Sequence, residues 1–355
     1  MKTSPSGAAH GAIAIATATA IALATAAVAA VAAGAAATEA VVRTPLEVPA
    51  GKSALAIRAP LNAIGLAGTR LVVAGQRGHI LYSDDNGKAW VQAEVPVSAD
   101  LTALHFATPK LGWAVGHEGV VLHTTDGGAS WQLLLDGRRI GALLAEQGGP
   151  AAADAGADKA LLDVWFENEK AGWAVGAFNL ILRTEDGGRS WTPWSERTDN
   201  AKGMHLYALR PAGGTLVIVG EQGLVLKLDR GKQRFVNVPL PYKGTLFGVV
   251  GDDQMTLVFG LRGNAWRSTD AGATWTKAET GVAAGLTSAL VRKDGSVVLV
   301  SQAGHVLQSS DHGATFSRVD LRAAAPTFAL AETAGGAIAL AGIGGVRIEA
   351  VKPGR

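Results

Sequence analysis

A pattern of about 40 residues recurs along this chain, and it limits the possible folds more than any other feature. In every copy an apolar run closes on a small residue, at Gly75, Gly116, Gly176, Gly220, Gly260, Ser301 and Gly342. Successive copies lie 41, 60, 44, 40, 41 and 41 residues apart. An aromatic residue keeps the same steps, at Trp90, Trp131, Trp191, Phe235, Trp275 and Phe316. Two independent markers therefore define seven repeats.

Each repeat is predicted to hold four short strands. In the second repeat these begin with the alternating run "LTALHFA" (101–107), continue with "GWAVG" (112–116) and "VVLHT" (120–124), and end after a glycine-rich turn. One such sheet cannot bury both of its faces alone, whereas stacking around a ring buries them and removes exposed edges. We therefore predict an all-β fold, a seven-bladed β-propeller over residues 38–355.

The two ends of the chain suggest how the ring closes. The seventh repeat stops at "VRIEAVKPGR" and lacks a fourth strand. The segment "VVRTPLEVPA" (41–50) precedes the first repeat as "WVQAEVPVSA" (90–99) precedes the second, so it is predicted to close the ring as an N-terminal outer strand. The 60-residue step between the second and third repeats leaves 19 additional residues. They are predicted to form a loop insertion at about 137–160, with a short helix around "GALLAEQ" (141–147).

The first 37 residues have the layout of an export signal. Lys2 and His10 precede an uncharged, Ala-rich stretch from Gly11 to Ala37, and Ala35 and Ala37 give an A-x-A processing site. Residues 1–37 are thus predicted to be a signal peptide or an N-terminal anchor. The chain has no cysteine, which excludes a lipid-anchoring thiol and disulfides. We expect an exported protein, periplasmic or in a compartment like the thylakoid lumen, either free or tethered by this segment.

Charge and composition exclude several classes of partner. The formal net charge is +2 and only 17% of residues are charged, so no basic field favours nucleic acid. The eight histidines are dispersed and no phosphate loop occurs. We expect no metal, no cofactor and no small-molecule substrate.

The glycine-rich turn recurs as an eight-residue box, for example "TTDGGASW" (124–131) and "TEDGGRSW" (184–191), with a decayed copy at "KLDRGKQRF" (227–235). An Asp can accept hydrogen bonds from turn N–H groups, Gly tolerates positive φ, and the aromatic ring can pack between sheets. A catalytic site is built once, whereas this box occurs six times, so no catalytic residue is assigned. The predicted structural residues are Asp85, Asp126, Asp186, Asp229, Asp270, Asp311, Trp90, Trp131, Trp191, Trp275 and Phe316.

The box pattern S/T-x-D-x-G-x-S/T-W is the Asp-box, or BNR, repeat. The longer copies "GWAVGHEGVVLHTTDGGASW" (112–131) and "GWAVGAFNLILRTEDGGRSW" (172–191) resemble repeats of the photosystem II stability and assembly factor family, seven-bladed propellers of the lumen or periplasm. The resemblance implies a non-enzymatic scaffold that binds a protein partner and helps to assemble or stabilise a membrane-protein complex. Such repeats also occur in bacteria without photosystem II, so the client, and a role in photosynthesis, stay open.

Two other functions remain as alternatives. Sialidases and other glycosidases share the Asp-box, and "IRAP" (57–60) resembles their first substrate-binding arginine element, with Arg58. The three tyrosines, Tyr82, Tyr207 and Tyr242, lie outside the last two repeats, where the nucleophile would be expected. The third possibility is an accessory subunit of an envelope transport complex.

Recognition is expected on one face of the ring. Links between the second and third strands share a face with the connections between blades, and the boxes occupy the opposite face. The links vary while the surrounding pattern stays fixed, and variable loops on a rigid frame are where binding residues concentrate. The predicted partner-binding residues are Arg77, His117, Glu118, Arg138, Arg139, Phe178, Glu221, Arg262 and Gln302.

Overall fold

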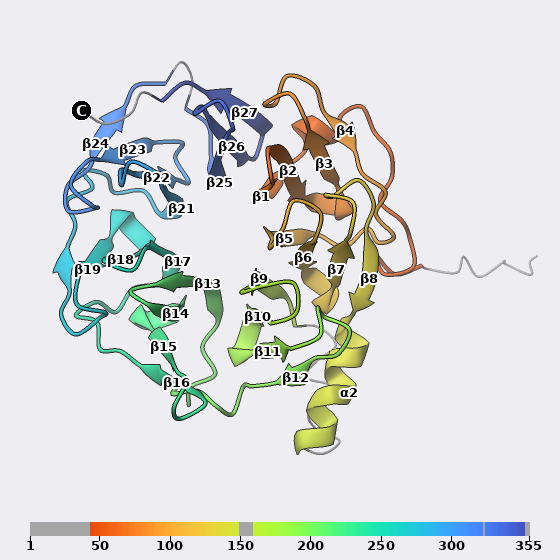
Figure 1. Cartoon of the computed structure of the whole chain (residues 1–355), viewed down its shortest axis with the longest axis horizontal. Helices are drawn as coiled ribbons and strands as arrows, with labels where there is room; N and C mark the ends of the chain where they lie inside the picture. Colours follow the sequence, from red (N-terminus) through yellow and green to blue (C-terminus); the bar gives the residue numbers. More distant parts are fainter. Residues whose placement is uncertain (1–42, 149–158, 322–323, 352–355) are drawn as a thin grey trace, which may run out of the picture. The chain divides into compact units, whose positions relative to one another are not determined.

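The computed structural model describes residues 43–148, 159–321 and 324–351. The chain from Thr44 to Arg355 forms one compact unit, in which seven antiparallel sheets surround a central opening (Figure 1). The predicted seven-bladed propeller is confirmed. The predicted signal or anchor, residues 1–37, lies outside the described residues.

Every blade is an antiparallel meander in chain order. Blade 1 consists of β1 (Leu61–Ala67), β2 (Arg70–Gly75), β3 (Ile80–Ser83) and β4 (Val91–Gln92). Blade 2 consists of β5 (Leu101–Phe106), β6 (Gly112–Gly116), β7 (Val121–Thr124) and β8 (Gln132–Leu135). Blade 3 consists of β9 (Leu161–Phe166), β10 (Gly172–Gly176), β11 (Ile181–Thr184) and β12 (Thr192–Pro193). Blades 4 to 7 consist of β13 (Leu206–Ala212), β14 (Thr215–Gly220), β15 (Val225–Asp229) and β16 (Arg234–Asn237); β17 (Leu246–Gly251), β18 (Thr256–Gly260), β19 (Ala265–Ser268) and β20 (Thr276–Lys277); β21 (Leu286–Val291), β22 (Val297–Ser301), β23 (Val306–Ser309) and β24 (Ser317–Val319); and β25 (Thr327–Glu332), β26 (Ile338–Gly342) and β27 (Gly345–Glu349).

The sequence of each strand reflects its distance from the ring axis. The second strands are buried on both faces, as in β6 and β10, because a neighbouring blade covers each side. The first strands line the central channel, and polar side chains join them across blades. The Thr102 hydroxyl donates to the Leu161 carbonyl at 2.7 Å, and the Thr287 hydroxyl to the Thr327 carbonyl at 2.7 Å. These bonds fix neighbouring blades to one another at the channel.

The box aromatics hold the blades together further out. Trp131 of blade 2 is 4% exposed and packs in one cluster with Val72 and Ala93 of blade 1. Its indole N–H donates to the Gly128 carbonyl at 3.1 Å, which orients the ring. Phe235 of blade 4 packs in the same way against Trp173 of blade 3. The predicted role of the aromatic marker, packing between blades, is thereby explained by direct contacts.

The predicted closing strand at 41–50 is wrong over its described part, residues 43–50, which form no strand. The Pro45 carbonyl accepts from the Ser98 N–H at 2.8 Å, and the Ala50 N–H donates to the Val95 carbonyl at 3.0 Å, so this segment lies against the connection between blades 1 and 2. Two prolines in the segment remove donors that a strand ladder would need. The chain then enters β1 through the turn η1 (Ala56–Arg58), which contacts β27. Between the described ends of the chain, a link and not a strand therefore joins blade 7 to blade 1.

The insertion between blades 2 and 3 begins with helix α2 (Gly137–Gly148), where we predicted a loop with a shorter helix. The Asp136 carboxylate caps the helix by accepting from the Arg139 N–H at 2.9 Å. Ile140 is fully buried, and Leu143 and Leu144 pack against the core of blades 2 and 3. Residues 149–158 lie outside the described part. Within the described ranges no helix has the length and apolar character to span a membrane.

Candidate functional site

The box turns satisfy their own polar groups. The Asp126 carboxylate accepts from the N–H groups of Ala129 and Ser130, both at 3.0 Å, and from the hydroxyls of Thr124 at 2.8 Å and Ser130 at 2.6 Å. The Thr124 hydroxyl also accepts from the Gly128 N–H at 2.9 Å. Comparable bonds form around Asp85, Asp186, Asp270 and Asp311, and Asp229 keeps one of them, from the Lys232 N–H. The geometry is that of a turn clamp.

These bonds keep the box carboxylates ionised. The Thr274 hydroxyl and N–H lower the pKa of Asp270 to about 2. Partial burial raises the pKa of Asp311, but hydrogen bonds from Ser309 and Thr315 outweigh it and leave that pKa at about 2. A general acid needs the opposite shift, because it must carry a proton near neutral pH.

The links between second and third strands lie at the other end of the strands, and in blades 1 to 5 they share one backbone conformation. Each is a 3₁₀ turn: η2 (Gln76–Gly78), η3 (His117–Gly119), η4 (Ala177–Asn179), η5 (Glu221–Gly223) and η6 (Leu261–Gly263). The central residue has a left-handed conformation in all five, with φ of 55° at Arg77, 57° at Glu118, 54° at Phe178, 54° at Gln222 and 58° at Arg262. This conformation is uncommon for residues other than Gly, Asn and Asp. The same backbone thus presents a different side chain in most blades.

Most predicted partner-binding residues are exposed in these turns or next to them. Arg77, His117, Phe178, Arg262 and Gln302 are accessible at the links, and Glu118 and Glu221 are half-exposed. Arg138 and Arg139 are exposed at the start of α2, which contacts η3. Arg138 pairs with Asp136 at 3.2 Å, and Glu221 accepts from the His205 N–H at 2.8 Å, so these two are partly engaged within the chain.

Phe178 is the most distinctive of the predicted residues. Its side chain is 60% exposed although its backbone is left-handed. The His205 Nδ1 atom accepts from the Phe178 N–H at 2.9 Å, and the two rings meet edge to face with centroids 4.5 Å apart. A bulky aromatic side chain held outward in this conformation costs stability, which is typical of a binding position.

Several aromatic neighbours of Phe178, and two exposed apolar residues at other links, were not predicted from the sequence. His205, Tyr207 and Phe247 continue an aromatic series from η4 to the channel wall, with centroid distances of 6.3 and 5.6 Å between successive rings. Leu261 and Ile343 are exposed at the links of blades 5 and 7, at 36% and 54%. Apolar letters in the links "LR" and "IG" were the available signal for these two.

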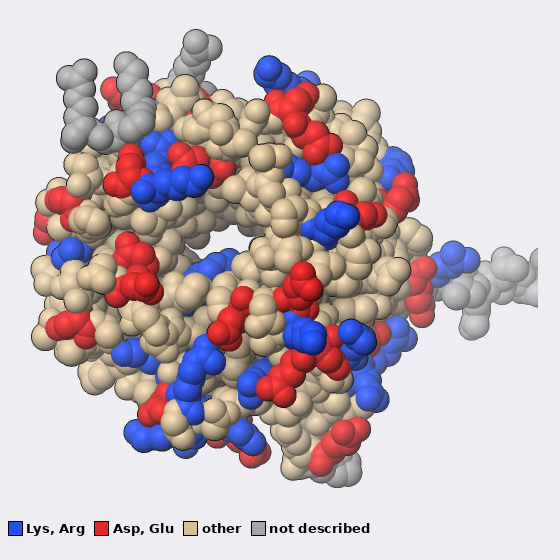
Figure 2. Space-filling view, viewed as in Figure 1, with Lys and Arg blue, Asp and Glu red and all other residues tan. Residues whose placement is uncertain are grey.

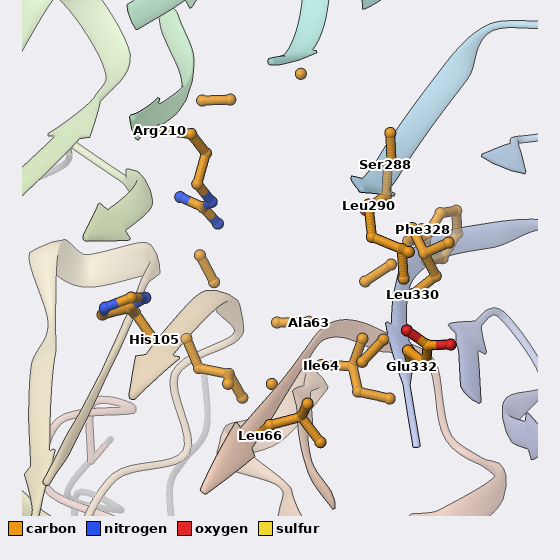
Figure 3. A pocket seen from close by; sticks show the side chains of 18 of the residues that line it. Ala63, Ile64, Leu66, His105, Arg210, Ser288, Leu290, Phe328, Leu330 and Glu332 are labelled. Atoms are coloured by element: carbon orange, nitrogen blue, oxygen red, sulfur yellow. The ribbon is translucent and has the colours of Figure 1, made fainter. Parts of the chain in front are cut away.

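The central channel opens through the ring, and the face seen in Figure 2 carries acidic and basic side chains side by side around it. Its volume is about 1200 Å³. Arg210 extends into the channel from one side, opposite Leu290, Phe328 and Leu330 (Figure 3). The His105 ring lies at the channel wall, turned toward β9, with Nε2 3.1 Å from the Phe166 carbonyl oxygen. Asp163 neutralises Arg210 through an ion pair of 2.6 Å, and burial together with the charge of Arg210 lowers the pKa of His105 to about 4.

The described residues contain no group of three His, Asp or Glu side chains able to hold a metal ion. Arg58, which the glycosidase alternative would use, lies in η1 at the closing link. Tyr207 instead lines the channel from β13.

The chain matches known proteins in sequence and in structure. The family model described as photosynthesis system II assembly factor YCF48 matches residues 151–330. The photosystem II assembly lipoprotein Ycf48 of Synechococcus sp. (strain CC9902) is 27% identical over 144 residues, which are 39% of this chain and 43% of that protein. The chloroplastic photosystem II stability/assembly factor HCF136 of Cyanidioschyzon merolae (strain NIES-3377 / 10D) is 35% identical over 102 residues, 27% of this chain and 22% of that protein. The chain thus matches less than half the length of each of these relatives.

Two solved structures share the fold. A structure described as YCF48 bound to D1 peptide superposes with a TM-score of 0.65 at 18% identity, covering 84% of this chain and 95% of that one. YCF48 from Cyanidioschyzon merolae gives a TM-score of 0.63 at 16% identity, covering 84% and 96%. The relatives found by sequence carry the names of assembly factors. Because the family model spans half of the sequence, the chain belongs to the photosynthesis system II assembly factor YCF48 family.

Proposed function

We propose that this protein is an exported, non-enzymatic scaffold that binds a membrane-protein complex through its link face and assists the assembly or stability of that complex. The link face is defined here as the turns between second and third strands together with the start of α2. Family membership and the names of the relatives support an assembly role. The solved propeller described as YCF48 bound to D1 peptide supports a polypeptide as ligand.

The observation that carries the assignment of the face is the contrast between backbone and side chains at the links. Five blades repeat one strained turn, yet the residue at its centre is Arg, Glu, Phe, Gln or Arg. Structure alone would favour Gly or Asn at every such position. Retaining large, unlike side chains there supports their use in recognising a partner.

Charge reversal tests this face. The double variant Arg77→Glu/Arg262→Glu changes two exposed links, and Lys110→Glu/Arg189→Glu makes the same charge change on exposed residues at the box end of the ring. Both variants, tagged at the C-terminus, would be expressed in the source organism and their membrane-protein partners quantified by mass spectrometry. We expect the link variant to lose its partner about tenfold or more, because rim charges steer and hold protein complexes. Retention of the partner by the link variant would show that the face is wrong.

The same experiment separates the possible clients. A photosystem subunit among the quantified partners supports the photosynthetic role, and a transporter subunit supports the accessory role in an envelope complex. Export is tested by protease access to the tagged chain in spheroplasts, where we expect digestion without lysis. Hydrolysis of aryl sialosides or aryl glucosides that Arg58→Ala abolishes would contradict the non-enzymatic assignment.

A further inference from the structure

Over the residues that the structure describes, the seventh blade has one strand fewer than the others. Its described sheet is β25-β26-β27, whereas each of the other six sheets has a fourth, outer strand. β27 is therefore an edge strand, and exposed edges are sites where another polypeptide can pair. The outer segments that pair with the third strands of the other blades indicate what kind of segment would fit beside β27.

Backbone groups of the third strand identify the missing bonds. In four blades the outer segment donates an N–H to the carbonyl at one fixed position: Ala93 to Ile80 at 2.9 Å, Trp194 to Ile181 at 2.8 Å, Val238 to Val225 at 2.8 Å, and Ala278 to Ala265 at 3.0 Å. Val346 holds this position in blade 7, since it pairs with Ala341 just before the link glycine. Within the described part of the chain no outer segment donates to the Val346 carbonyl.

A pocket lies near this edge, since two of its lining residues, Leu81 and Trp90, share a hydrophobic cluster with Val346. It has a volume of about 590 Å³ and is lined by Leu81 and Trp90 of blade 1 and by Ile57 of the closing link. The pocket is the counterpart of a filled position one blade further on, because Leu122 and Trp131 lie 41 residues after Leu81 and Trp90. There the outer segment of blade 1 covers the equivalent surface with Ala93 and Val95.

Trp90 also lacks a backbone bond that three of the other five box aromatics make; Trp191 and Trp275 make no such bond among the described residues either. The N–H groups of Trp131, Phe235 and Phe316 donate to carbonyls of the preceding blade's outer segment, at Glu94 (2.9 Å), Arg197 (2.8 Å) and Glu279 (2.9 Å). The Trp90 N–H donates to no carbonyl among the described residues. An extended segment in the gap would accept from Trp90 and donate to Val346.

The described ends of this chain do not supply that segment. Val351 turns toward blade 6, where it packs with Val298 and Val300 and its carbonyl accepts from Arg292 at 3.2 Å. At the other end, Pro45 is bonded to Ser98 at the junction of blades 1 and 2.

We propose that the edge of β27 and the adjoining Leu81–Trp90 pocket bind an extended segment of a partner protein, which adds as the fourth strand of blade 7. The segment carries small or β-branched apolar side chains, as Ala93 and Val95 do in blade 1, and a free N–H at the position facing Val346. This proposal rests on the proposed function as a protein-binding scaffold, and it adds a second contact distinct from the link face.

The test uses the full chain and a blocked synthetic peptide, VQAEVPVS, which copies Val91–Ser98. We expect saturable binding and a rise of about tenfold or more in hydrogen-exchange protection at Val346 and Ile348, whose N–H groups point to the same open side. In blade 1 the Glu94 N–H also donates, to the Ala129 carbonyl of the next blade at 3.0 Å. A control peptide N-methylated at the positions of Ala93 and Glu94 keeps the side chains but removes both of these donors. It should bind at least about tenfold more weakly.

The protein variants isolate the edge. Ile348→Pro removes an outward N–H and leaves the β26 ladder intact, since proline is tolerated on an edge strand, and we expect it to lose peptide binding. Ile348→Val keeps the N–H and should bind as the unaltered chain does. Arg77→Glu/Arg262→Glu should also bind the peptide normally, so retention of the membrane partner by this variant would count against the link face and not against the edge.

Three results of the binding assay would overturn the proposal: no saturable binding, equal binding of the N-methylated peptide, or equal binding by Ile348→Pro. Protection of Val346 and Ile348 in the chain without peptide would also overturn it, because the edge would then be covered by the protein's own N-terminal residues or by a second copy.

Discussion

The two faces of the ring differ in what is repeated from blade to blade. At the box face the side chains repeat: Asp126 and Asp311 make the same bonds in different blades, and every bond ends within the turn or on its neighbour. At the link face the backbone repeats, while the side chain at its centre changes from Arg77 to Glu118 to Phe178. Constant side chains that satisfy one another build the frame, and changing side chains on a constant backbone are free to contact something else.

The largest expected difference between the faces is in stability. Trp131→Ala removes a buried aromatic side chain from the core between blades 1 and 2, and we expect a loss of about 3–5 kcal/mol in the free energy of unfolding. Phe178→Ala, which removes an exposed ring from the link face, should change it by about 0.5 kcal/mol or less. Urea unfolding of both variants measures this. Similar losses at the two positions would remove the distinction between frame and surface.

The second largest effect is expected at acidic pH, where the box carboxylates should lose their contribution to stability. The pKa values of Asp270 and Asp311 are about 2 in the folded chain, below the unfolded value of 3.8. Their contribution to stability is therefore fully present above pH 4 and is lost as the pH falls toward 2. Thermal unfolding between pH 5 and pH 2 should show a falling midpoint, with a shallower fall in Asp311→Asn. The unfolding midpoint of Asp253→Asn, a change at an exposed turn residue, should fall as steeply as that of the unaltered chain.

Replacing one box carboxylate should lower the free energy of unfolding more than replacing one link carboxylate. Asp126→Asn keeps the size of the side chain but cannot accept all four hydrogen bonds, so we expect a loss of about 1–2 kcal/mol at neutral pH. The free energy of unfolding of Glu118→Gln should lie within about 0.5 kcal/mol of that of the unaltered chain. Chemical denaturation at pH 7 compares them, and an equal effect would mean that the box bonds do not clamp the turn.

The smallest expected effect has the opposite sign. Phe178→Asn places a residue that tolerates positive φ at a left-handed position, so stability should rise by up to about 1 kcal/mol while partner binding falls. Differential scanning calorimetry and the co-purification assay together check this. A variant that loses stability and keeps its partner would indicate that Phe178 serves the fold.

The repeat made the fold predictable. Its two markers give the number of blades, and alternation gives the strands, because a propeller strand must be apolar wherever a neighbouring blade covers it. The closing segment was not predictable in the same way. "VVRTPLEVPA" resembles an outer strand locally, but the partners of Pro45 and Ala50 are Ser98 and Val95, and only the folded ring brings these residues together.

The links that form the candidate site were predictable in place but not in backbone conformation. Positions 77, 118, 178 and 262 were identified from the variability of the links, whereas their left-handed backbone was missed. A signal existed in the glycine that follows at positions 78, 119 and 263, since "RG" and "EG" pairs in short links are typical of tight turns. The ring contact of Phe178 with His205 could not be predicted, because 27 residues and a blade boundary separate them.

The most direct test of the link face uses the absence of native cysteines, which makes an introduced one unique. Single cysteines at Gln302 on the link face and at Arg189 on the box face, each exposed, would carry a photo-crosslinker of the same length. If the link face binds the partner, the Gln302 probe crosslinks to a defined membrane-protein subunit in native membranes and the Arg189 probe does not. Crosslinking of that subunit from Arg189 and not from Gln302 would contradict the assignment of the link face.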